Sequence, residues 1–250
     1  MEYSKKIPVK KSWGQNFIID QNVINKIISI INPNSNDIIL EIGPGKGALT
    51  IPLSKKIKKL YAVEIDPLLV KYLKSKKINN TDIINKDILK TDLNSYNEST
   101  KIIGNLPYYI TSPIIFKMIE NNVNRMFFMV QKEVAERIVS VHNNKNYSRI
   151  SVMVQTFYNC EINYSISKNV FIPKPKVNSA IIKFKKKDIS NIDYKKYSNF
   201  VKAAFKQKRK KIKNNLKNII NENGIEIFGE RRAENISIDE YIKIFNNYML

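Results

Sequence analysis

The chain has 250 residues, 43% of them apolar, so it can bury a sizeable core in one large domain, or in one domain with a small appendage. Its 43 Lys and Arg against 22 Asp and Glu give a net charge of +21, which indicates a polyanionic partner, with an anionic membrane surface as the competing one. No apolar run approaches the roughly 18–20 residues of a membrane span, and residues 1–11 lack the apolar core of a signal peptide. We therefore expect a soluble, cytoplasmic protein.

The chain contains one cysteine, Cys160, and one histidine, His142. One of each excludes an internal disulfide and a Cys/His zinc cluster. His142 lies in a polar stretch typical of an exposed loop, and Cys160 ends an apolar run, as a small buried hydrophobe does. The sequence therefore disfavours a metal enzyme.

The first predicted helix begins at Asp20, a good capping residue, and has apolar positions at helical spacing over residues 23–31. Pro33 ends it. The apolar run 38–42 is then typical of a buried strand, and it leads into a turn with glycines at alternate positions.

Three further apolar runs, at residues 60–65, 82–85 and 101–104, each end in polar or turn residues. Residues 68–76 lie between the first two and carry apolar side chains at helical spacing. This alternation predicts βαβ units and a parallel sheet, to which residues 126–131 add a fifth strand.

Residues 150–158 and 180–184 are predicted to be two more strands, paired antiparallel at the sheet edge because no clear long helix separates them. The total is seven strands in an α/β fold. The strand pattern stops near Lys187, and the rest is predicted to be helical, at residues 194–205, 209–221 and 238–248. We therefore predict a cofactor-binding domain at 1–187 and a small helical domain at 188–250.

The predicted helical domain contains the densest basic run of the chain, residues 206–213, with six cations in eight positions. Such a run is either a solvated helix face or a surface for phosphates, since mutual repulsion is costly without an anion nearby. The second interpretation assigns RNA binding to Lys206, Lys208, Arg209, Lys210 and Lys211.

The glycine turn Gly43-Pro44-Gly45-Lys46-Gly47 lies at the carboxyl end of the first strand, where open parallel sheets bind ligands. Glu64, 21 residues beyond Gly43, ends the second strand. A carboxylate at this position can accept hydrogen bonds from both ribose hydroxyls. Asp87, at the end of the third, can meet an adenine edge. Together these residues imply a nucleotide cofactor.

Two cofactors remain in competition. The spacing Gly43-x-Gly45-x-x-Ala48 satisfies a loose dinucleotide fingerprint, so NAD is one of them. However, Pro44 removes an N–H from the turn that would hold a pyrophosphate, and nothing else suggests hydride chemistry. S-adenosylmethionine with methylation of an amino group fits the pattern better.

Asn105-Leu106-Pro107-Tyr108 places an amide, two carbonyls and an aromatic ring at one strand end. Adenine N6 is a poor nucleophile, and acceptors on its two hydrogens, Asn105 Oδ1 and the Leu106 carbonyl, would pull it toward tetrahedral geometry. Pro107 stiffens the turn, and Tyr108 can stack on a flipped base. The alternative is an ordinary strand exit closed by a proline.

The sequence closely resembles the KsgA family, the small-subunit ribosomal RNA adenine dimethyltransferases. The matching stretches span almost the whole chain: residues 14–18, 41–45, 104–108, 131–134, 171–179 and 232–237. The resemblance implies a class I S-adenosylmethionine-dependent methyltransferase domain, with a Rossmann-like seven-stranded sheet, and a small all-helical C-terminal domain. One departure is Lys208, where the family has an arginine, which puts a bidentate grip there in doubt.

The resemblance also implies the roles of particular residues. The implied cofactor contacts are Asn16, Ile18, Gly43, Gly45, Glu64, Ile65, Asp87, Ile88 and Asn105. Asn105, Leu106 and Tyr108 are implied to surround the target base, with Phe171 as a second stacking wall. The alternative for Phe171 is a core aromatic.

The implied reaction is dimethylation of N6 on two adjacent adenosines in a hairpin loop near the 3′ end of small-subunit ribosomal RNA, together with a role in small-subunit assembly. The implied partners are that RNA and the immature small subunit, with the enzyme acting as a monomer without metal or membrane. Two alternatives remain: an Erm-like methyltransferase of large-subunit RNA, and a non-catalytic assembly factor. Residues 232–237 and the basic helical segment favour the small subunit.

Overall fold

The computed structural model describes residues 7–10, 13–96, 99–189 and 192–250. The chain folds into two compact units. The first contains the residues up to Ala135 together with Glu161–Lys185, and the second contains Glu136–Cys160 and Lys186–Leu250. The second unit thus begins its C-terminal part close to the predicted boundary at 187, and it also takes in a segment from the middle of the sequence.

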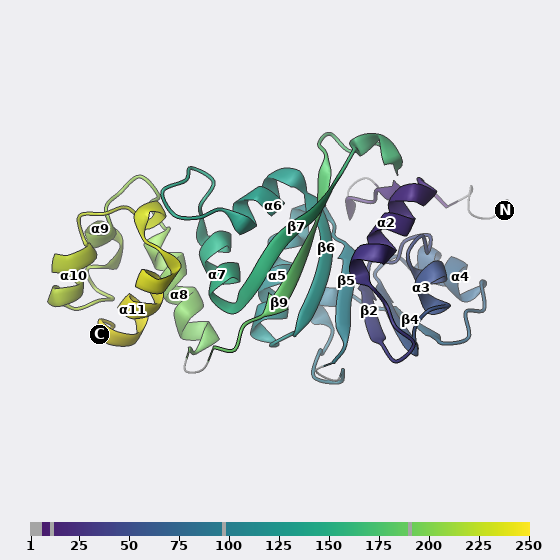
Figure 1. Ribbon diagram of the computed structural model, residues 1–250, viewed down its shortest axis with the longest axis horizontal. Helices are drawn as coiled ribbons and strands as arrows, with labels where there is room; N and C mark the ends of the chain where they lie inside the picture. Colours follow the sequence, from purple (N-terminus) through teal and green to yellow (C-terminus); the bar gives the residue numbers. More distant parts are fainter. Residues whose placement is uncertain (1–6, 11–12, 97–98, 190–191) are drawn as a thin grey trace. The chain divides into compact units, whose positions relative to one another are not determined.

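Within the described residues, seven strands form the large sheet of Figure 1, in the order β4-β3-β2-β5-β6-β9-β7. The strands are β2 (Ile38–Ile42), β3 (Lys59–Glu64), β4 (Thr81–Asn85), β5 (Lys101–Asn105), β6 (Arg125–Gln131), β7 (Tyr158–Ile166) and β9 (Ser179–Lys186). The strands from β4 to β6 pair in parallel, and β9 pairs antiparallel with β6. The predicted α/β class with a seven-stranded sheet is confirmed.

Helices of the first unit lie before and between these strands, and short 3₁₀ turns follow three of the strands. They are α2 (Gln21–Ile31), α3 (Thr50–Ser54), α4 (Pro67–Lys74) and α5 (Thr111–Glu120), with η2 (Ile88–Lys90), η3 (Tyr108–Ile110) and η4 (Lys168–Val170). A second sheet pairs two short antiparallel strands, β1 (Phe17–Ile18) and β8 (Phe171–Ile172). It joins the N-terminal segment to the loop that precedes β9.

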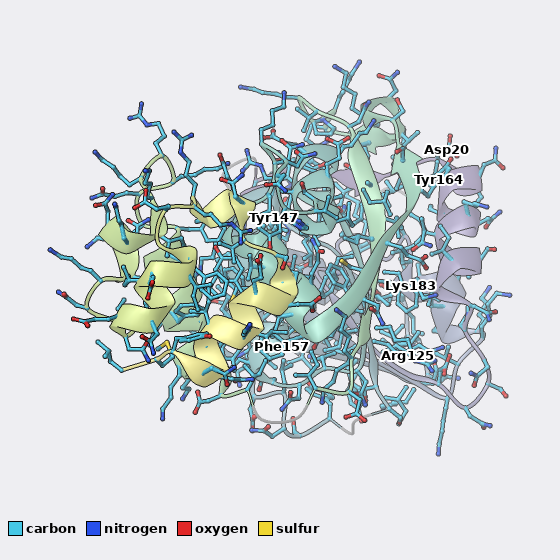
Figure 2. The ribbon with its side chains drawn as sticks, turned by 60° about the vertical axis from the view of Figure 1, so that its left-hand side comes forward. Asp20, Arg125, Tyr147, Phe157, Tyr164 and Lys183 are labelled. Atoms are coloured by element: carbon cyan, nitrogen blue, oxygen red, sulfur yellow. The ribbon has the colours of Figure 1, made fainter. Side chains whose placement is uncertain are left out.

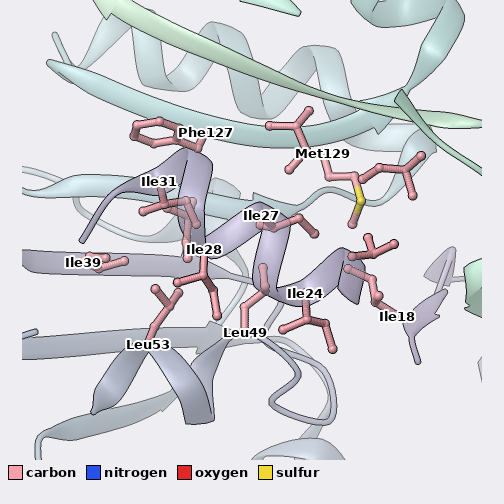
Figure 3. Close-up of a cluster of buried hydrophobic side chains, with 14 of the residues drawn as sticks. Ile18, Ile24, Ile27, Ile28, Ile31, Ile39, Leu49, Leu53, Phe127 and Met129 are labelled. Atoms are coloured by element: carbon pink, nitrogen blue, oxygen red, sulfur yellow. The ribbon is translucent and has the colours of Figure 1, made fainter. Parts of the chain in front are cut away.

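The helix predicted from the Asp20 cap and the apolar positions at 23–31 is confirmed as α2, which covers one face of the large sheet. The Asp20 side chain accepts a hydrogen bond from the Val23 N–H at 3.0 Å, and Asn32 ends the helix in the left-handed region at φ 47°. Figure 3 shows its buried face against Phe127 and Met129 of β6. This apolar contact buries one face of the sheet and forms part of the core of the first unit.

The prediction of a strand at 150–158 is wrong, because Arg149–Phe157 forms helix α7. Its β-branched residues favour a strand, but the helix is buried over most of its length, and a capping box between Ser148 and Ser151 starts it. The seventh strand is instead β7, whose exposed positions alternate and carry polar side chains. Such a polar edge strand has no apolar run to reveal it.

The second unit is helical and has an aromatic core. Its helices are α7, the end of α6 (Lys132–Val139), α8 (Tyr194–Ala204), α9 (Ile212–Leu216), α10 (Glu222–Phe228) and α11 (Ile238–Asn247), with η5 (Ala233–Asn235). Tyr197 lies at the centre of the core, edge-on to Phe245 at 5.1 Å and to Phe157 at 5.8 Å, and Phe157 is labelled in Figure 2.

The helix predicted at 209–221 is much shorter in the structure. Only Ile212–Leu216 is α-helical there, and a separate helix, α10, begins after the cap Asn221. Adjacent like charges disfavour a long helix through the basic run, and the asparagines that follow favour turns and caps.

Candidate active site

A cavity of the first unit lies at the carboxyl ends of β2, β3 and β5 and has a volume of about 280 Å³. Strand β2 has β3 on one side and β5 on the other, so the chain crosses the sheet in opposite directions from this point. Open α/β sheets bind ligands at such a switch point. The volume is close to the lower end for small-molecule sites.

All nine predicted cofactor residues line this cavity. They are Asn16, Ile18, Gly43, Gly45, Glu64, Ile65, Asp87, Ile88 and Asn105. The glycine turn requires its glycines, because Gly43 and Gly45 have φ values of +65° and +59°. A Cβ on Gly45 would also lie 3.0 Å from the Phe17 ring, so the ring closes directly over the turn.

Glu64 is 5% exposed and is held by the main chain around the cavity. Its Oε2 accepts from the Gly45 N–H at 3.1 Å and its Oε1 from the Asp66 N–H at 2.9 Å. Burial raises the pKa of Glu64, although both N–H donors oppose the rise. A carboxylate has about four acceptor positions, and the N–H groups of Asp66, Gly45 and Ile65 use part of that capacity, so only the rest is open to a ligand's hydroxyl groups.

Glu41, a second buried acid, also lines the cavity and was not singled out from the sequence. Its Oε2 accepts from the Thr50 hydroxyl at 2.7 Å. Burial raises its pKa to about 7, opposed by the Thr50 hydrogen bond and reinforced by the charge of Glu64. Its position inside an apolar strand is the only sequence signal it gives.

The N-terminal segment forms one wall of the cavity and is held by Asp66. Lys10 Nζ lies 2.9 Å from Asp66 Oδ1, and Gln15 Nε2 donates to Asp66 Oδ2 at 3.0 Å. The Lys10 N–H in turn donates to Gln15 Oε1 at 2.8 Å. Burial tends to raise the pKa of Asp66, but the donors from Lys10, Gln15 and Leu68 outweigh it and hold that pKa below its usual range.

Asn105 connects this wall to the turn after β5. Its Nδ2 donates to the Asn16 carbonyl at 2.8 Å, which fixes the orientation of the amide. No described residue donates a hydrogen bond to Asn105 Oδ1, which is therefore available to a ligand. The Leu106 carbonyl likewise has no donor among the described residues, whereas the Pro107 carbonyl accepts from Thr111 Oγ1 at 3.1 Å.

The structure does not bring the two predicted stacking rings to the cavity. The Tyr108 hydroxyl is 2.7 Å from Ser179 Oγ and its ring is half-buried. Phe171 is 2% exposed and belongs to the core cluster with Ile18, because β8 pairs with β1 there. Neither residue is among those that line the cavity.

Three aromatic side chains line the cavity, Trp13, Phe17 and Tyr109, and of these Tyr109, which lies in the turn after β5, was not singled out from the sequence. It is 60% exposed, and it packs against Gly14, where a Cβ would lie 3.4 Å from the ring. The doubled tyrosine of the turn was the available signal. The exposed side chains of Ile19 and Ile172 line the same cavity.

The predicted RNA-binding residues all lie in the second unit and differ in their pairing. Lys208 Nζ is 3.3 Å from a Glu234 carboxylate oxygen. Lys211 and Lys213 both bind Glu230. Lys206, Arg209 and Lys210 are exposed and form no ion pair among the described residues.

The described residues contain neither a metal-binding cluster nor a membrane-spanning helix. No cluster of three or more His, Cys, Asp or Glu side chains is arranged to hold a metal ion. No described helix combines the length and apolar character of a membrane span.

Comparisons with known proteins identify the family of the chain. Residues 7–249 match the sequence profile of the family described as "Ribosomal RNA adenine dimethylase". "Ribosomal RNA small subunit methyltransferase A" of Francisella tularensis subsp. novicida is 41% identical, covering 98% of this chain and 99% of the relative. The protein of that name from Mycoplasma mycoides subsp. mycoides SC is 44% identical, covering 95% and 96%.

Solved structures show the same fold. A dimethyladenosine transferase from Plasmodium falciparum superposes with a TM-score of 0.80 at 26% identity, covering 91% of this chain and 95% of that one. The 23S rRNA methyltransferase ErmE superposes with a TM-score of 0.71 at 24% identity, covering 92% and 98%, and supports the fold alone. The resemblance to the KsgA family is confirmed: the chain belongs to the ribosomal RNA adenine dimethylase family, whose members are methyltransferases.

Proposed function

We propose that the chain dimethylates N6 of two adjacent adenosines in a hairpin loop near the 3′ end of small-subunit ribosomal RNA. Family membership and relatives named for the small subunit support the substrate. The observation that carries the chemistry is the oriented Asn105 amide, held at 2.8 Å by the Asn16 carbonyl at the edge of the cavity.

The cavity fits S-adenosylmethionine as the cofactor. Glu64 would accept hydrogen bonds from the ribose hydroxyls. Asp87, with Ile65 and Ile88, would hold the adenine end of the cofactor. The glycine turn leaves room for main-chain approach, and Asn16 and Ile18 would close the other side. When bound, this cofactor supplies an electrophilic methyl group on its sulfonium.

The target adenine would be held by neutral acceptors. Asn105 Oδ1 and the Leu106 carbonyl would each accept one hydrogen of N6, which localises the nitrogen lone pair for attack. The exposed Tyr109 ring would stack on the flipped base. Stacking by Phe171 would require its buried ring to leave the core cluster, and Tyr108 does not line the cavity, whereas Tyr109 does.

No strong general base is required in this mechanism. The N6 nitrogen becomes acidic as it gains the methyl group, and its proton can leave to solvent. The chain would therefore accelerate the reaction through positioning and through acceptors placed in advance. Repetition on the same nitrogen uses the same acceptors with one hydrogen fewer.

The second unit would contact the RNA through its basic segment. Lys206, Arg209 and Lys210 are the exposed cations without an ion pair among the described residues, and so are best suited to phosphates. The immature small subunit is the proposed partner, and the chain would act as a monomer. Action on large-subunit RNA and a purely non-catalytic assembly role are the alternatives.

Incubation with labelled S-adenosylmethionine tests the proposal. Isolated small and large subunits that lack the modification are supplied separately, with wild-type chain and with Asn105→Ala. We expect label in small-subunit RNA with the wild type and almost none with the variant. Label in the large subunit would favour the Erm-like alternative, and absence of label with tight binding would favour the assembly role.

A further inference from the structure

Four cations gather at the end of the large sheet opposite to the active site. They line a cavity of about 320 Å³ together with the last turn of α2, and all of them belong to the first unit. They are Lys101, Arg125, Lys183 and Lys185. Lys101 begins β5 and Arg125 begins β6, so the cavity lies at the amino ends of these strands, whereas the active site lies at their carboxyl ends.

The strand register places three of these cations in one row. Lys101 is the direct partner of Arg125 in the β5–β6 pair, and Arg125 is the direct partner of Lys185 in the β6–β9 pair. Neighbouring strands are about 4.8 Å apart, and like charges directly opposite each other destabilise a sheet. An arrangement that costs stability without an anion indicates a site for one.

The row lies on the face of the sheet that α2 covers. Phe127, two residues after Arg125, packs in the core under α2, so Arg125 points to the same face. Figure 2 labels Arg125 and Lys183 on this side, toward the end of α2 opposite to Asp20. Helix α2 ends at Ile31, and beyond its end this face of the sheet carries cations in place of apolar side chains.

The nearby acids neutralise only part of this charge. Lys101 is 6% exposed, and its Nζ lies 2.6 Å from Asp37 Oδ2 and 3.4 Å from the Asn32 carbonyl. Lys183 Nζ lies 3.5 Å from Glu161 Oε1. Arg125 and Lys185 are exposed and have no ion pair among the described residues.

We propose that Arg125, Lys185 and Lys183 form a second RNA contact that holds a backbone phosphate at the end of the sheet remote from the methyl-transfer site. Arginine suits a phosphate because its planar guanidinium donates two parallel hydrogen bonds. Lys101, neutralised by Asp37, completes the floor of the cavity. The proposal rests on the proposed function, because it takes its polyanion to be the RNA that is methylated.

A long RNA can reach both sites at once. Residues 101–105 of β5 separate the row from Asn105, roughly 13 Å at 3.3 Å per residue. Two contacts on one rigid unit raise the affinity for an extended substrate more than for a short one. The row would thus favour large structured RNA over an isolated loop.

The test compares the double variant Arg125→Gln/Lys185→Gln with the matched control Lys55→Gln/Lys56→Gln. The control removes the same charge from exposed positions of the same unit. Binding of small-subunit RNA to the full chain is measured over a range of salt. In the double variant we expect the slope of log Kd against log salt to fall by roughly 0.7–0.9 for each phosphate that is no longer neutralised, and the affinity to fall about tenfold at fixed salt.

Two further measurements separate a binding role from a structural one. The melting temperature of the double variant should not fall, because two like charges are relieved, and its affinity for S-adenosylmethionine should stay that of the wild type. Arg125→Lys, which keeps the charge, should keep most of the salt slope. If the double variant does not fold, Lys185→Gln alone, at an exposed side chain, should still lower the slope.

Two outcomes would overturn the proposal. One is a salt slope and an affinity of the double variant equal to those of the control. The other is a result in which inorganic phosphate binds the wild type but not the double variant, while both bind RNA with the same affinity. That result would assign the row to a small phosphorylated ligand. Methyl transfer by the wild type is assayed separately, so a failure of the proposed function is distinguished from a failure of the row.

Discussion

The side-chain amide of Asn105 donates to the main-chain carbonyl of Asn16 at 2.8 Å, across 89 positions of sequence. This bond joins the N-terminal wall of the cavity to the turn after β5. Because Asn105 Nδ2 donates to Asn16, the other end of the amide, Oδ1, faces a ligand as an acceptor. The wall and the proposed acceptor are therefore one structural element.

Replacement of Asn105 should remove methyl transfer while RNA still binds. Loss of one such acceptor costs about 3 kcal/mol of transition-state stabilisation, so Asn105→Ala should lower kcat about 10²–10³-fold. Asn105→Asp should also be impaired, because its carboxylate would face the Asn16 carbonyl without a donor. Single-turnover methylation and RNA binding are measured beside Asn36→Ala, an exposed control. Wild-type turnover in Asn105→Ala would remove Asn105 from the mechanism.

Tyr109 should determine how well the flipped base is held. Stacking of one base on an aromatic ring is worth about 1–3 kcal/mol, so Tyr109→Ala should weaken productive RNA binding about 5- to 150-fold, whereas Tyr109→Phe should be close to wild type. The measurement is the fluorescence of 2-aminopurine at the target position, quenched on binding to the wild type. Tyr108→Phe, which removes only the hydrogen bond to Ser179, is the comparison. Equal quenching in wild type and Tyr109→Ala would refute the stacking role.

The buried carboxyl of Glu41 should make stability depend on pH. Its pKa is raised to about 7 in the folded chain, chiefly by burial. The contribution of this raised pKa to the free energy of unfolding is fully present below the unfolded pKa of about 4.5. It is lost as the pH rises through the folded pKa of about 7. Glu41→Gln keeps an acceptor for Thr50 and cannot ionise, so it should be more stable than wild type by up to about 3 kcal/mol at pH 8 and close to it at pH 4.5.

Urea unfolding at both pH values checks this, with the exposed Glu226→Gln as the control. If wild type and Glu41→Gln lose stability in parallel between pH 4.5 and pH 8, Glu41 is not the group responsible.

Glu230 should restrain RNA binding by the second unit. It binds both Lys211 and Lys213, and the hydrogen bonds from these two side chains lower the pKa of Glu230 to about 2. Glu230→Gln should free two lysines, raise RNA affinity at low salt and steepen the salt dependence. Glu222→Gln, an exposed change of the same charge, is the control. Equal effects of the two variants would show that only net charge matters.

The sequence predicted those parts of the fold whose signals are local. The cap Asp20 and the isoleucines of α2 specify a helix by themselves, and the glycine turn with Glu64 specifies the cavity, since each depends on a few neighbouring residues. Helix α7 was missed because its β-branched residues favour a strand and its burial, a tertiary property, overrides them.

The aromatic side of the site could not be predicted for a similar reason. Tyr108 and Tyr109 are adjacent and chemically alike, and only the packing of Ser179 and Gly14 decides which ring faces the cavity. The placement of Phe171 depends on the pairing of β8 with β1, a contact between distant parts of the chain. The division of the basic segment into paired and unpaired cations depends on Glu230 and Glu234, which lie outside it.

Mass mapping of methylated adenines tests the central claim most directly. Unmodified small-subunit RNA is incubated with the chain and S-adenosylmethionine, digested and sequenced by mass. The account predicts two adjacent adenosines, each carrying two methyl groups on N6, with wild-type chain and neither with Asn105→Ala. Methyl groups on another base or another atom, or an unchanged pattern with Asn105→Ala, would contradict it.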